Sequence, residues 1–247
     1  MVFFDVGDAG DGFLVSTREG KHLLVDGGGR NSGIIDALRA RKVPRIDVLV
    51  ATNPDADHIG GLVNVLKAIP VGEVWLSGDT NTTITFEDFL KAVDASKAAV
   101  HAARRGDVIH LGPLPVPVLN PSEPMFPDRN NNSVALRVAI GSVSFLFTGD
   151  MEAEAEGRLV QSEINLRSTV LKLGHHGSRT STSAPFLAAV RPEVAVYQAG
   201  INNRYGHPHP ETLAALAKAG VKVYGTGKNG VIVVITDGDT YEVKTHR

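Results

Sequence analysis

The sequence predicts an α/β or α+β domain with two mixed sheets in the middle and helices outside. Short runs rich in Val, Ile, Leu and Phe alternate along the chain with stretches of helical spacing. The run at 47–52 is continuously apolar, as buried central strands are. Turn residues at Gly141-Ser142 and at Asp237-Gly238-Asp239 predict two hairpins.

The predicted strands are bounded by Gly, Asn, Asp and Pro. We expect them at 2–6, 12–16, 21–26, 47–52, 73–77, 116–120, 133–140, 142–148, 168–173, 194–199, 221–226, 230–236 and 240–244. We expect helices at 32–41, 60–68, 86–96, 152–161, 183–190 and 210–219. Leu213, Leu216 and Ala217 recur at helical spacing in the last helix. Pro210 suits its first turn, and Gly220 ends it.

The least regular region is 113–132, which holds six prolines and ends in Asn130-Asn131-Asn132. We expect it to be either a linker between two halves or a loop over a site. Each half runs hairpin, strand, helix, strand, without an exact repeat. The sequence therefore predicts a single domain, 1–247, with two similar halves at about 1–120 and 130–247.

The composition excludes several classes of protein. With 43% hydrophobic and 21% charged residues, the chain of 247 residues is neither disordered nor collagen-like. The net charge of −2 gives no global basic field for nucleic acid, although a local basic patch is compatible with it. Because there is no cysteine, any metal must rest on His, Asp and Glu. No signal peptide or spanning segment is visible, so we expect a soluble chain without membrane insertion.

Four acidic or histidine clusters each follow a predicted strand. They lie at 52–61, 148–150, 174–178 and 202–209. Strands that share a direction end at one sheet edge, where open sheets bind ligands. Crowded carboxylates repel one another, and a divalent cation relieves that repulsion. We therefore expect one shared His/carboxylate metal site, of a kind that suits Zn²⁺ or Mn²⁺.

Simpler interpretations of the same residues stay open. Asp55 or Asp57 would also serve as a cap of the following helix, with His58 incidental. Paired histidines at a strand end, such as His175 and His176, suit metal ligation or proton transfer, but histidines on a loop are often only solvated.

Basic residues near these clusters have two interpretations. Arg179, Arg204 and Lys228 would hold phosphates, or they are surface charges. The segment Gly225-Thr226-Gly227-Lys228 lacks the spacing of a phosphate-binding loop and its following Ser or Thr. This motif on its own therefore predicts no nucleotide site.

Seven fragments, in this order, resemble the metallo-β-lactamase superfamily. They are Asp5-Val6-Gly7, Leu24-Val25-Asp26-Gly27-Gly28, 53–61 (NPDADHIGG), Asn131-Asn132-Ser133, Thr148-Gly149-Asp150, His175-His176-Gly177-Ser178 and Tyr205-Gly206-His207-Pro208. Within it, the chain is most similar to the C-terminal domain of ComEC-type DNA-internalisation competence proteins, from about residue 2 to about residue 215. The resemblance implies an αββα four-layer sandwich with the metal centre at the open edge between the two sheets.

The resemblance also implies roles for individual residues. The implied metal ligands are Asp55, Asp57, His58, Asp150 and His207, with Asn53 in place of the first His of the H-x-H-x-D-H signature and His175 as a further candidate. Asp57, His175 and His176 are the implied catalytic residues, and Asp26 orients the site from behind. Substrate contacts are expected from Asn132, Ser133, Ser178, Arg179 and Arg204. The segment 7–12 departs from the family's G-Q-G-D by one inserted residue.

The implied activity is phosphodiester hydrolysis with one or two divalent metal ions, Mn or Zn. Asp57 would orient the water, and His175 or His176 would protonate the leaving oxygen. The implied substrate is DNA, with single strands favoured, degraded during uptake. The implied partner is the membrane channel of a larger competence protein, which makes the chain extracytoplasmic as an excised domain and cytoplasmic as a stand-alone protein.

Two other functions remain open. A metallo-hydrolase of a small ester, such as a phosphocholine or a lactone, is mildly favoured by the acidic net charge. A degenerate, non-catalytic DNA-binding module is suggested by Asn53, because an amide is a weaker ligand than an imidazole.

Overall fold

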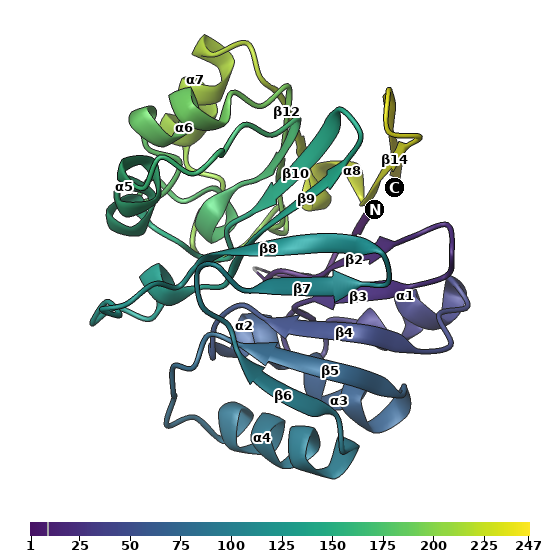
Figure 1. Cartoon of the computed structure of the whole chain (residues 1–247). Coiled ribbons are helices and arrows are strands. Elements are labelled where there is room, and N and C mark those ends of the chain that lie inside the picture. Colours follow the sequence, from purple (N-terminus) through teal and green to yellow (C-terminus); the bar gives the residue numbers. More distant parts are fainter. Residues whose placement is uncertain (9) are drawn as a thin grey trace.

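Two β-sheets lie face to face in the middle of the molecule, with helices on their outer sides (Figure 1). The computed structural model describes residues 1–8 and 10–247. Each sheet mixes parallel and antiparallel strands. This arrangement confirms the predicted α/β architecture.

The first sheet has eight strands in the order β15-β14-β1-β2-β3-β4-β5-β6. Their bounds are β1 Val2–Phe3, β2 Phe13–Ser16, β3 His22–Val25, β4 Ile46–Ala51, β5 Val71–Leu76, β6 Ala99–Ala102, β14 Val231–Thr236 and β15 Tyr241–His246. Strands β3 to β6 run parallel, and the other neighbours pair antiparallel. The hairpin predicted at Asp237-Gly238-Asp239 joins β14 to β15.

The second sheet has seven strands in the order β13-β12-β11-β10-β9-β8-β7. Their bounds are β7 Val108–Leu111, β8 Leu114–Asn120, β9 Ala135–Ile140, β10 Val143–Phe147, β11 Val170–Lys172, β12 Val194–Tyr197 and β13 Lys222–Gly225. Strands β10 to β13 run parallel, and the predicted hairpin at Gly141-Ser142 joins β9 to β10. The two halves of the chain therefore do not correspond exactly to the two sheets. β7 and β8, from the first half, belong to the second sheet, and β14 and β15, from the end of the chain, belong to the first.

The helices cover the outer faces of the two sheets. They are α1 Ile34–Ala40, α2 Ala56–Ile59, α3 Leu62–Ala68, α4 Ile84–Ser96, α5 Ala153–Gln161, α6 Ala184–Val190, α7 Pro210–Lys218 and α8 Thr226–Asn229. Two single turns of 3₁₀ helix lie at Asn130–Asn132 (η1) and Gly174–Gly177 (η2). Helices α1, α3 and α4 pack on the first sheet, and α5, α6 and α7 pack on the second.

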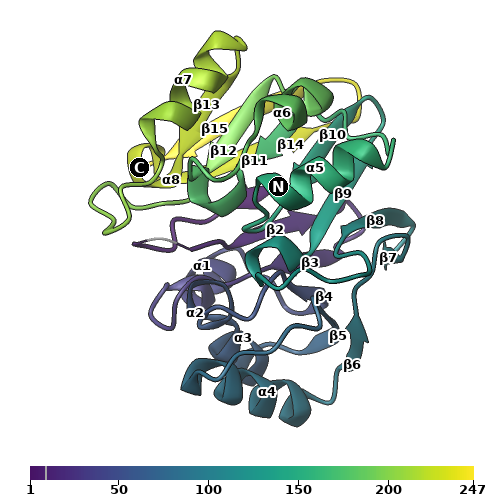
Figure 2. The same cartoon turned by 90° about the vertical axis from the view of Figure 1, so that its left-hand side faces the viewer.

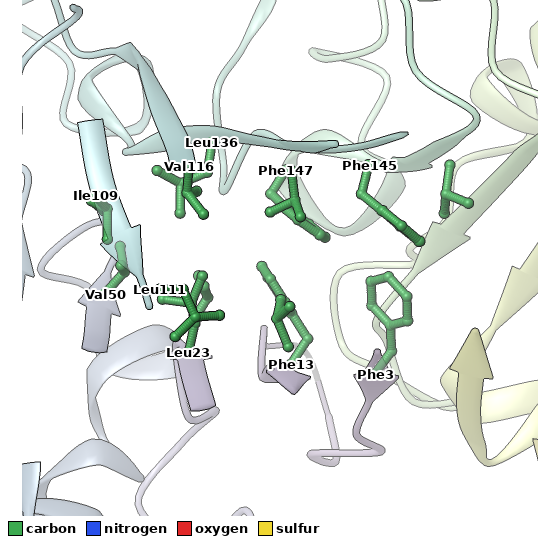
Figure 3. Close-up of a cluster of buried hydrophobic side chains, with 14 of the residues drawn as sticks. Phe3, Phe13, Leu23, Val50, Ile109, Leu111, Val116, Leu136, Phe145 and Phe147 are labelled. Carbon is green, nitrogen blue, oxygen red and sulfur yellow. The ribbon is translucent and has the colours of Figure 1, made fainter. Parts of the chain in front are cut away.

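A core of aromatic and aliphatic side chains fills the space between the sheets. Phe13 of the first sheet and Phe147 of the second stack with ring centroids 4.2 Å apart, and Phe3 packs beside them (Figure 3). Such offset aromatic pairs combine a large buried area with a favourable ring geometry. Residues that follow the carboxyl ends of β4, β10 and β11 meet along one edge of the two packed sheets.

The strand predicted at 116–120 is confirmed as part of β8, which lies between β7 and β9. The start of the region 113–132 is therefore neither a linker nor a loop over a site, which corrects that expectation. Pro115 and Pro117 fall in the part of β8 that pairs with the edge strand β7, while pairing with β9 starts only at Val118. Because β9 does not pair with β8 at these two positions, no hydrogen bond from a proline nitrogen to β9 is needed. The prolines are therefore tolerated in this strand.

Candidate metal centre

Residues from both sheets meet at the edge formed by the carboxyl ends of the parallel strands. Asp57 and His58 belong to α2, directly after β4, and Asp150 and His176 follow β10 and β11. In Figure 1, α2 lies at the left-hand end of β4, and Figure 2 turns that side toward the viewer. One ligand atom from each of these four side chains lies within 4.8 Å of the other three. The predicted convergence on one edge is therefore present for these residues.

His58 is fully buried between two aspartates. Its Nδ1 lies 2.8 Å from Asp26 Oδ2, and its Nε2 lies 3.0 Å from Asp150 Oδ2. The Thr52 N–H and hydroxyl donate to Asp26 at 2.8 and 2.6 Å and fix this carboxylate. Burial alone would lower the pKa of His58, but the carboxylates of Asp150, Asp26 and Asp57 outweigh it and raise the pKa well above its ordinary value.

His176 has a similar environment in the second sheet. Its Nδ1 lies 3.1 Å from Asp11 Oδ1, and its Nε2 lies 3.3 Å from Asp57 Oδ2 and 3.6 Å from Asp150 Oδ1. Against the effect of burial, the carboxylates of Asp150 and Asp11 raise the pKa of His176 to about 9. The backbone of His176 is left-handed at φ 55°, a strained conformation of the kind found at functional sites.

Asp11 is itself held by a buried lysine. Asp11 Oδ2 forms an ion pair with Lys172 Nζ, and both side chains are almost fully buried. The Lys172 ammonium also donates to the Gly149 carbonyl at 3.1 Å, next to Asp150. Burial would raise the pKa of Asp11, but Lys172 and then His176 lower it below the usual range.

His175 completes a set of three histidines that are each backed by a carboxylate. Its Nδ1 donates to Glu152 Oε1 at 2.9 Å, and its Nε2 lies 4.0 Å from Asp150 Oδ2. A carboxylate behind one ring nitrogen is typical of metal-binding histidines, because it fixes the tautomer and aims the other nitrogen at the ion.

The four-residue group suits a divalent cation. Asp150 Oδ1 and His176 Nε2 are buried, face each other, and have no hydrogen-bond partner in the described chain. Burial would raise the pKa of Asp150, but His58 and His176 hold it well below its usual value. The carboxylates are thus balanced by imidazolium charge, which a divalent cation would replace with release of protons. Imidazole and carboxylate ligands without thiolate suit Zn²⁺ or Mn²⁺.

Four of the sequence-predicted ligands, Asn53, Asp55, His175 and His207, lie outside this group. The carboxylate of Asp55 accepts hydrogen bonds from Asn81 Nδ2 at 2.8 Å and from Arg129 Nη2 at 3.2 Å. Asn53 accepts from the Asp55 N–H at 2.9 Å and donates to Ser133 Oγ at 3.3 Å. Both side chains therefore shape the loop that carries Asp57 and His58.

Ser133 and His207 lie beside the group of four. Ser133 Oγ accepts the Asp150 N–H at 3.1 Å, so this residue positions the aspartate. The His207 ring centroid lies 5.5 Å from that of His175 and 6.0 Å from that of His176. Burial, followed by the charges of His176 and His175, lowers the pKa of His207 to about 4.

The other predicted substrate contacts divide into one residue that lines the site and three that do not. Asn132 is buried and uses its amide on Asp79 and on the backbone of Phe126. Ser178 is buried and bonds Thr180. Arg179 is exposed, 3.9 Å from Glu211. Arg204, by contrast, lines the cavity over the cluster.

That cavity has a volume of about 400 Å³. Its lining comprises Asp8, Asp55, Ala56, Asp57, Asn81, Thr83, Arg129, Asn130, Asp150, His175, His176, Arg204, Tyr205 and His207. Arg129 and Arg204 thus bring positive charge to a space with an acidic floor. An anionic substrate and a cation fit together in such a space.

Four residues of the site were not predicted from the sequence: Asp11, Lys172, Glu152 and Arg129. Lys172 carried a usable signal, because a lysine inside the apolar run Val170–Leu173 must find a partner if that strand is buried. Asp11 lies in the segment 7–12, where the inserted residue hides its correspondence to the family motif.

An αββα sandwich with an Asp- and His-rich group at its open edge defines a class of metal-binding proteins. The chain belongs to the metallo-beta-lactamase superfamily, whose family profile matches residues 6–200. The crystal structure of the metallo-beta-lactamase fold protein YhfI from Bacillus subtilis superposes with a TM-score of 0.60 at 14% identity, covering 93% of this chain and 98% of that one. This likeness supports the fold.

Two curated relatives match this chain at higher identity. ComE operon protein 3 of Bacillus subtilis (strain 168) is 31% identical over 246 residues, covering 92% of this chain and 32% of that protein. Competence protein ComA of Neisseria gonorrhoeae is 36% identical over 232 residues, covering 92% of this chain and 31% of that protein. The chain thus spans about a third of the length of these relatives. In residues 1–8 and 10–247, no helix has the length and apolar character needed to cross a bilayer.

Proposed function

We propose that this protein is a metal-dependent phosphodiester hydrolase that degrades single-stranded DNA during DNA uptake. The observation that carries the proposal is the group of Asp57, His58, Asp150 and His176 beneath a cavity lined by Arg129 and Arg204. The similarity of the chain to two competence proteins supports DNA as the substrate. A membrane channel in a longer protein is the partner that this context suggests.

The residues of the group would hold one or two divalent cations, Mn or Zn. When bound, such a cation supplies Lewis-acid polarisation of a phosphoryl oxygen and neutralises its negative charge. Asp57 has the most exposed side chain of the four, at 36%, so its carboxylate is the group that reaches a water molecule in the cavity. It would orient that water for attack on phosphorus and accept one of its protons.

His175 would act as the general acid. Glu152 holds its Nδ1, which leaves Nε2 toward the cavity and close to Asp150. As the new bond between the water oxygen and phosphorus forms, the bond to the leaving oxygen breaks, and that oxygen takes the proton from Nε2. Arg129 and Arg204 would hold the flanking phosphate oxygens.

The proposal is tested by titrating the protein with Mn²⁺, Zn²⁺ and Mg²⁺ while measuring cleavage of labelled single-stranded DNA. We expect metal-dependent cleavage that falls at least about 100-fold in Asp57→Ala, because the water loses its base. Asp36→Ala, whose carboxylate is 86% exposed on α1, is the matched control and should cleave normally.

Two results would contradict the proposal. Metal binding without cleavage of DNA by any of the three ions would transfer support to a hydrolase of a small ester. Failure to bind metal would favour the non-catalytic DNA-binding module. Asn53→His adds information here, because a gain of activity would mean that an imidazole at residue 53 creates a better first ligand.

A further inference from the structure

A second cavity adjoins the one over the cluster. It has a volume of about 270 Å³ and is lined by Tyr197, Ala199, Gly200, Ile201, His207, Pro208, Gly227 and Lys228. His207 lines both cavities, so the loop 200–208 forms the wall between them. In Figure 2, the yellow-green loop after β12 projects on the same side of the molecule as α8.

Lys228 is held at this second cavity by close backbone packing. The Gly227 N–H donates to the Ala199 carbonyl at 3.0 Å. A Cβ on Gly227 would lie 2.5 Å from that oxygen and 2.7 Å from the Ile201 nitrogen, so only glycine allows α8 to dock here. The sequence motif Gly225–Lys228 therefore fixes α8, and with it Lys228, against the loop.

Lys228 also carries an unbalanced charge. Throughout the described residues, no carboxylate oxygen lies within 4.0 Å of its ammonium group, whereas Arg204 on the other side of the loop lies 3.6 Å from Asp8. The Lys228 side chain is exposed. A free ammonium at a cavity next to a phosphodiester site suits a second phosphate.

The crest of the loop carries an exposed aromatic side chain. Tyr205 is 49% exposed, and its ring stacks on His207 with centroids 5.7 Å apart and an interplanar angle of 23°. The guanidinium of Arg204 lies 4.9 Å from the centre of the Tyr205 ring, so a base that stacks on this face takes the place of the guanidinium. An exposed ring beside cationic groups is typical of surfaces that bind single strands.

We propose that the loop 200–208 carries a single-stranded polynucleotide from one cavity to the other, with a base stacked on Tyr205 and a neighbouring phosphate bound by Lys228. This inference rests on the proposed function and adds the path of the single strand across the protein and the two residues that hold it. Only an unpaired base can leave its neighbours to stack on a side chain, so the track selects single strands over duplexes. A small phosphodiester occupies the cluster alone and makes no use of the track.

The test compares two substrates under the activating metal. One is a fluorescent single-stranded oligonucleotide, and the other is bis(p-nitrophenyl) phosphate. In Lys228→Met and in Tyr205→Ala, we expect the ratio of kcat/KM for the oligonucleotide to that for the small substrate to fall about tenfold. Tyr205→Phe keeps the ring and should keep the ratio, and Lys218→Met, an exposed lysine of α7, is the charge-matched control.

The salt dependence gives an independent readout. Removing one phosphate contact should lower the slope of log affinity against log salt by about one in Lys228→Met. This is measured by fluorescence anisotropy of the oligonucleotide on Asp57→Ala protein, with Lys228→Met and Tyr205→Ala added to that background. An unchanged affinity, or an equal loss with duplex DNA, would overturn the track.

The anisotropy measurement separates the two proposals. A wild-type protein that cleaves neither substrate contradicts the proposed hydrolase. Even then, oligonucleotide binding that depends on Tyr205 and Lys228 would support the track, and binding that ignores both residues would overturn it.

Discussion

The rings of His58 and His176 lie 5.5 Å apart, one supplied by each sheet, and both present Nε2 to Asp150. The groups behind them differ. Asp26 backs His58 and is held by neutral donors of Thr52, whereas Asp11 backs His176 and is paired with the buried Lys172. The two halves of the centre are therefore similar in geometry and different in charge.

Asp11 should contribute to metal affinity without contacting the metal. Asp11→Asn removes the anion behind His176, which makes its Nε2 a poorer ligand and frees the ring to turn. Residues in this position typically contribute 10- to 100-fold to affinity, and we expect about that loss. Isothermal titration with Zn²⁺ or Mn²⁺ measures it. Asp36→Asn serves as the exposed control, and an affinity equal to wild type in Asp11→Asn would refute the role.

Lys172 should matter for stability through its partner. Lys172→Met removes the ammonium that is paired with the buried Asp11 and leaves His176 as its remaining ion-pair partner. Loss of one partner of a buried ion pair typically costs about 3–5 kcal/mol in the free energy of unfolding. The double variant Lys172→Met/Asp11→Asn removes both charges and should recover much of that loss. Urea denaturation of the metal-free proteins gives the coupling energy. Additive losses in the two single variants would contradict a direct ion pair.

Asp47 should make stability depend on pH at the other end of β4. Burial would raise the pKa of Asp47, but the His22 N–H at 2.9 Å and the Lys21 ammonium at 3.1 Å outweigh it and lower the pKa. A lowered pKa in the folded state means that the stabilisation is complete above the unfolded pKa of about 4 and is lost as the pH falls through the folded value.

Asp47→Ala should therefore cost about 2 kcal/mol at pH 7, because two donors lose a charged acceptor. The difference from wild type should shrink below about pH 4. Urea unfolding between pH 7 and pH 3 tests this, with Asp36→Ala as a control whose difference stays near zero. A difference in the free energy of unfolding between wild type and Asp47→Ala that grows as the pH falls would contradict the lowered pKa of Asp47.

Asn131 should act as a helix cap and not as a metal or substrate residue. Its Oδ1 accepts from the N–H groups of Glu152 and Ala155, both at 3.2 Å, at the start of α5. Asn131→Ala should destabilise the protein by about 1–2 kcal/mol. The thermal midpoint should fall, while Asn202→Ala, at an exposed position, should leave it unchanged. A loss of metal affinity in Asn131→Ala without a loss of stability would contradict the role as a helix cap.

The sequence was most informative where a residue type and a strand end coincide. The apolar strands before Asp57, Asp150 and His176 predicted their convergence, because parallel strands place their carboxyl ends on one edge. It was least informative about the carboxylates behind His175 and His176, whereas Asp26, behind His58, was among the predicted residues. Asp11 and Glu152 reach those rings across distances of 165 and 23 residues in sequence, which local pattern does not record.

The unpredicted strands β6 and β7 have a related cause. Both are edge strands, and their exposed residues replace the apolar runs that mark central strands. The short helix α2 was missed because Asp55, Asp57 and His58 looked like a loop sequence, and the predicted helix at 60–68 begins at Leu62. The formation of the edge strands β6 and β7 depends on pairing with neighbouring strands more than on local propensity.

The side chains of the candidate metal centre come from both sheets, so a bound cation would link the two layers of the sandwich. Ligand binding to the folded state alone adds about 2.7 kcal/mol of stability when the free ion is at 100 times its Kd. Chelation of the metal would then lower the free energy of unfolding of the domain as well as abolish the proposed hydrolysis. The metal concentration would thus determine how long the protein resists proteolysis. The metal-free protein would be degraded sooner than the metal-bound protein.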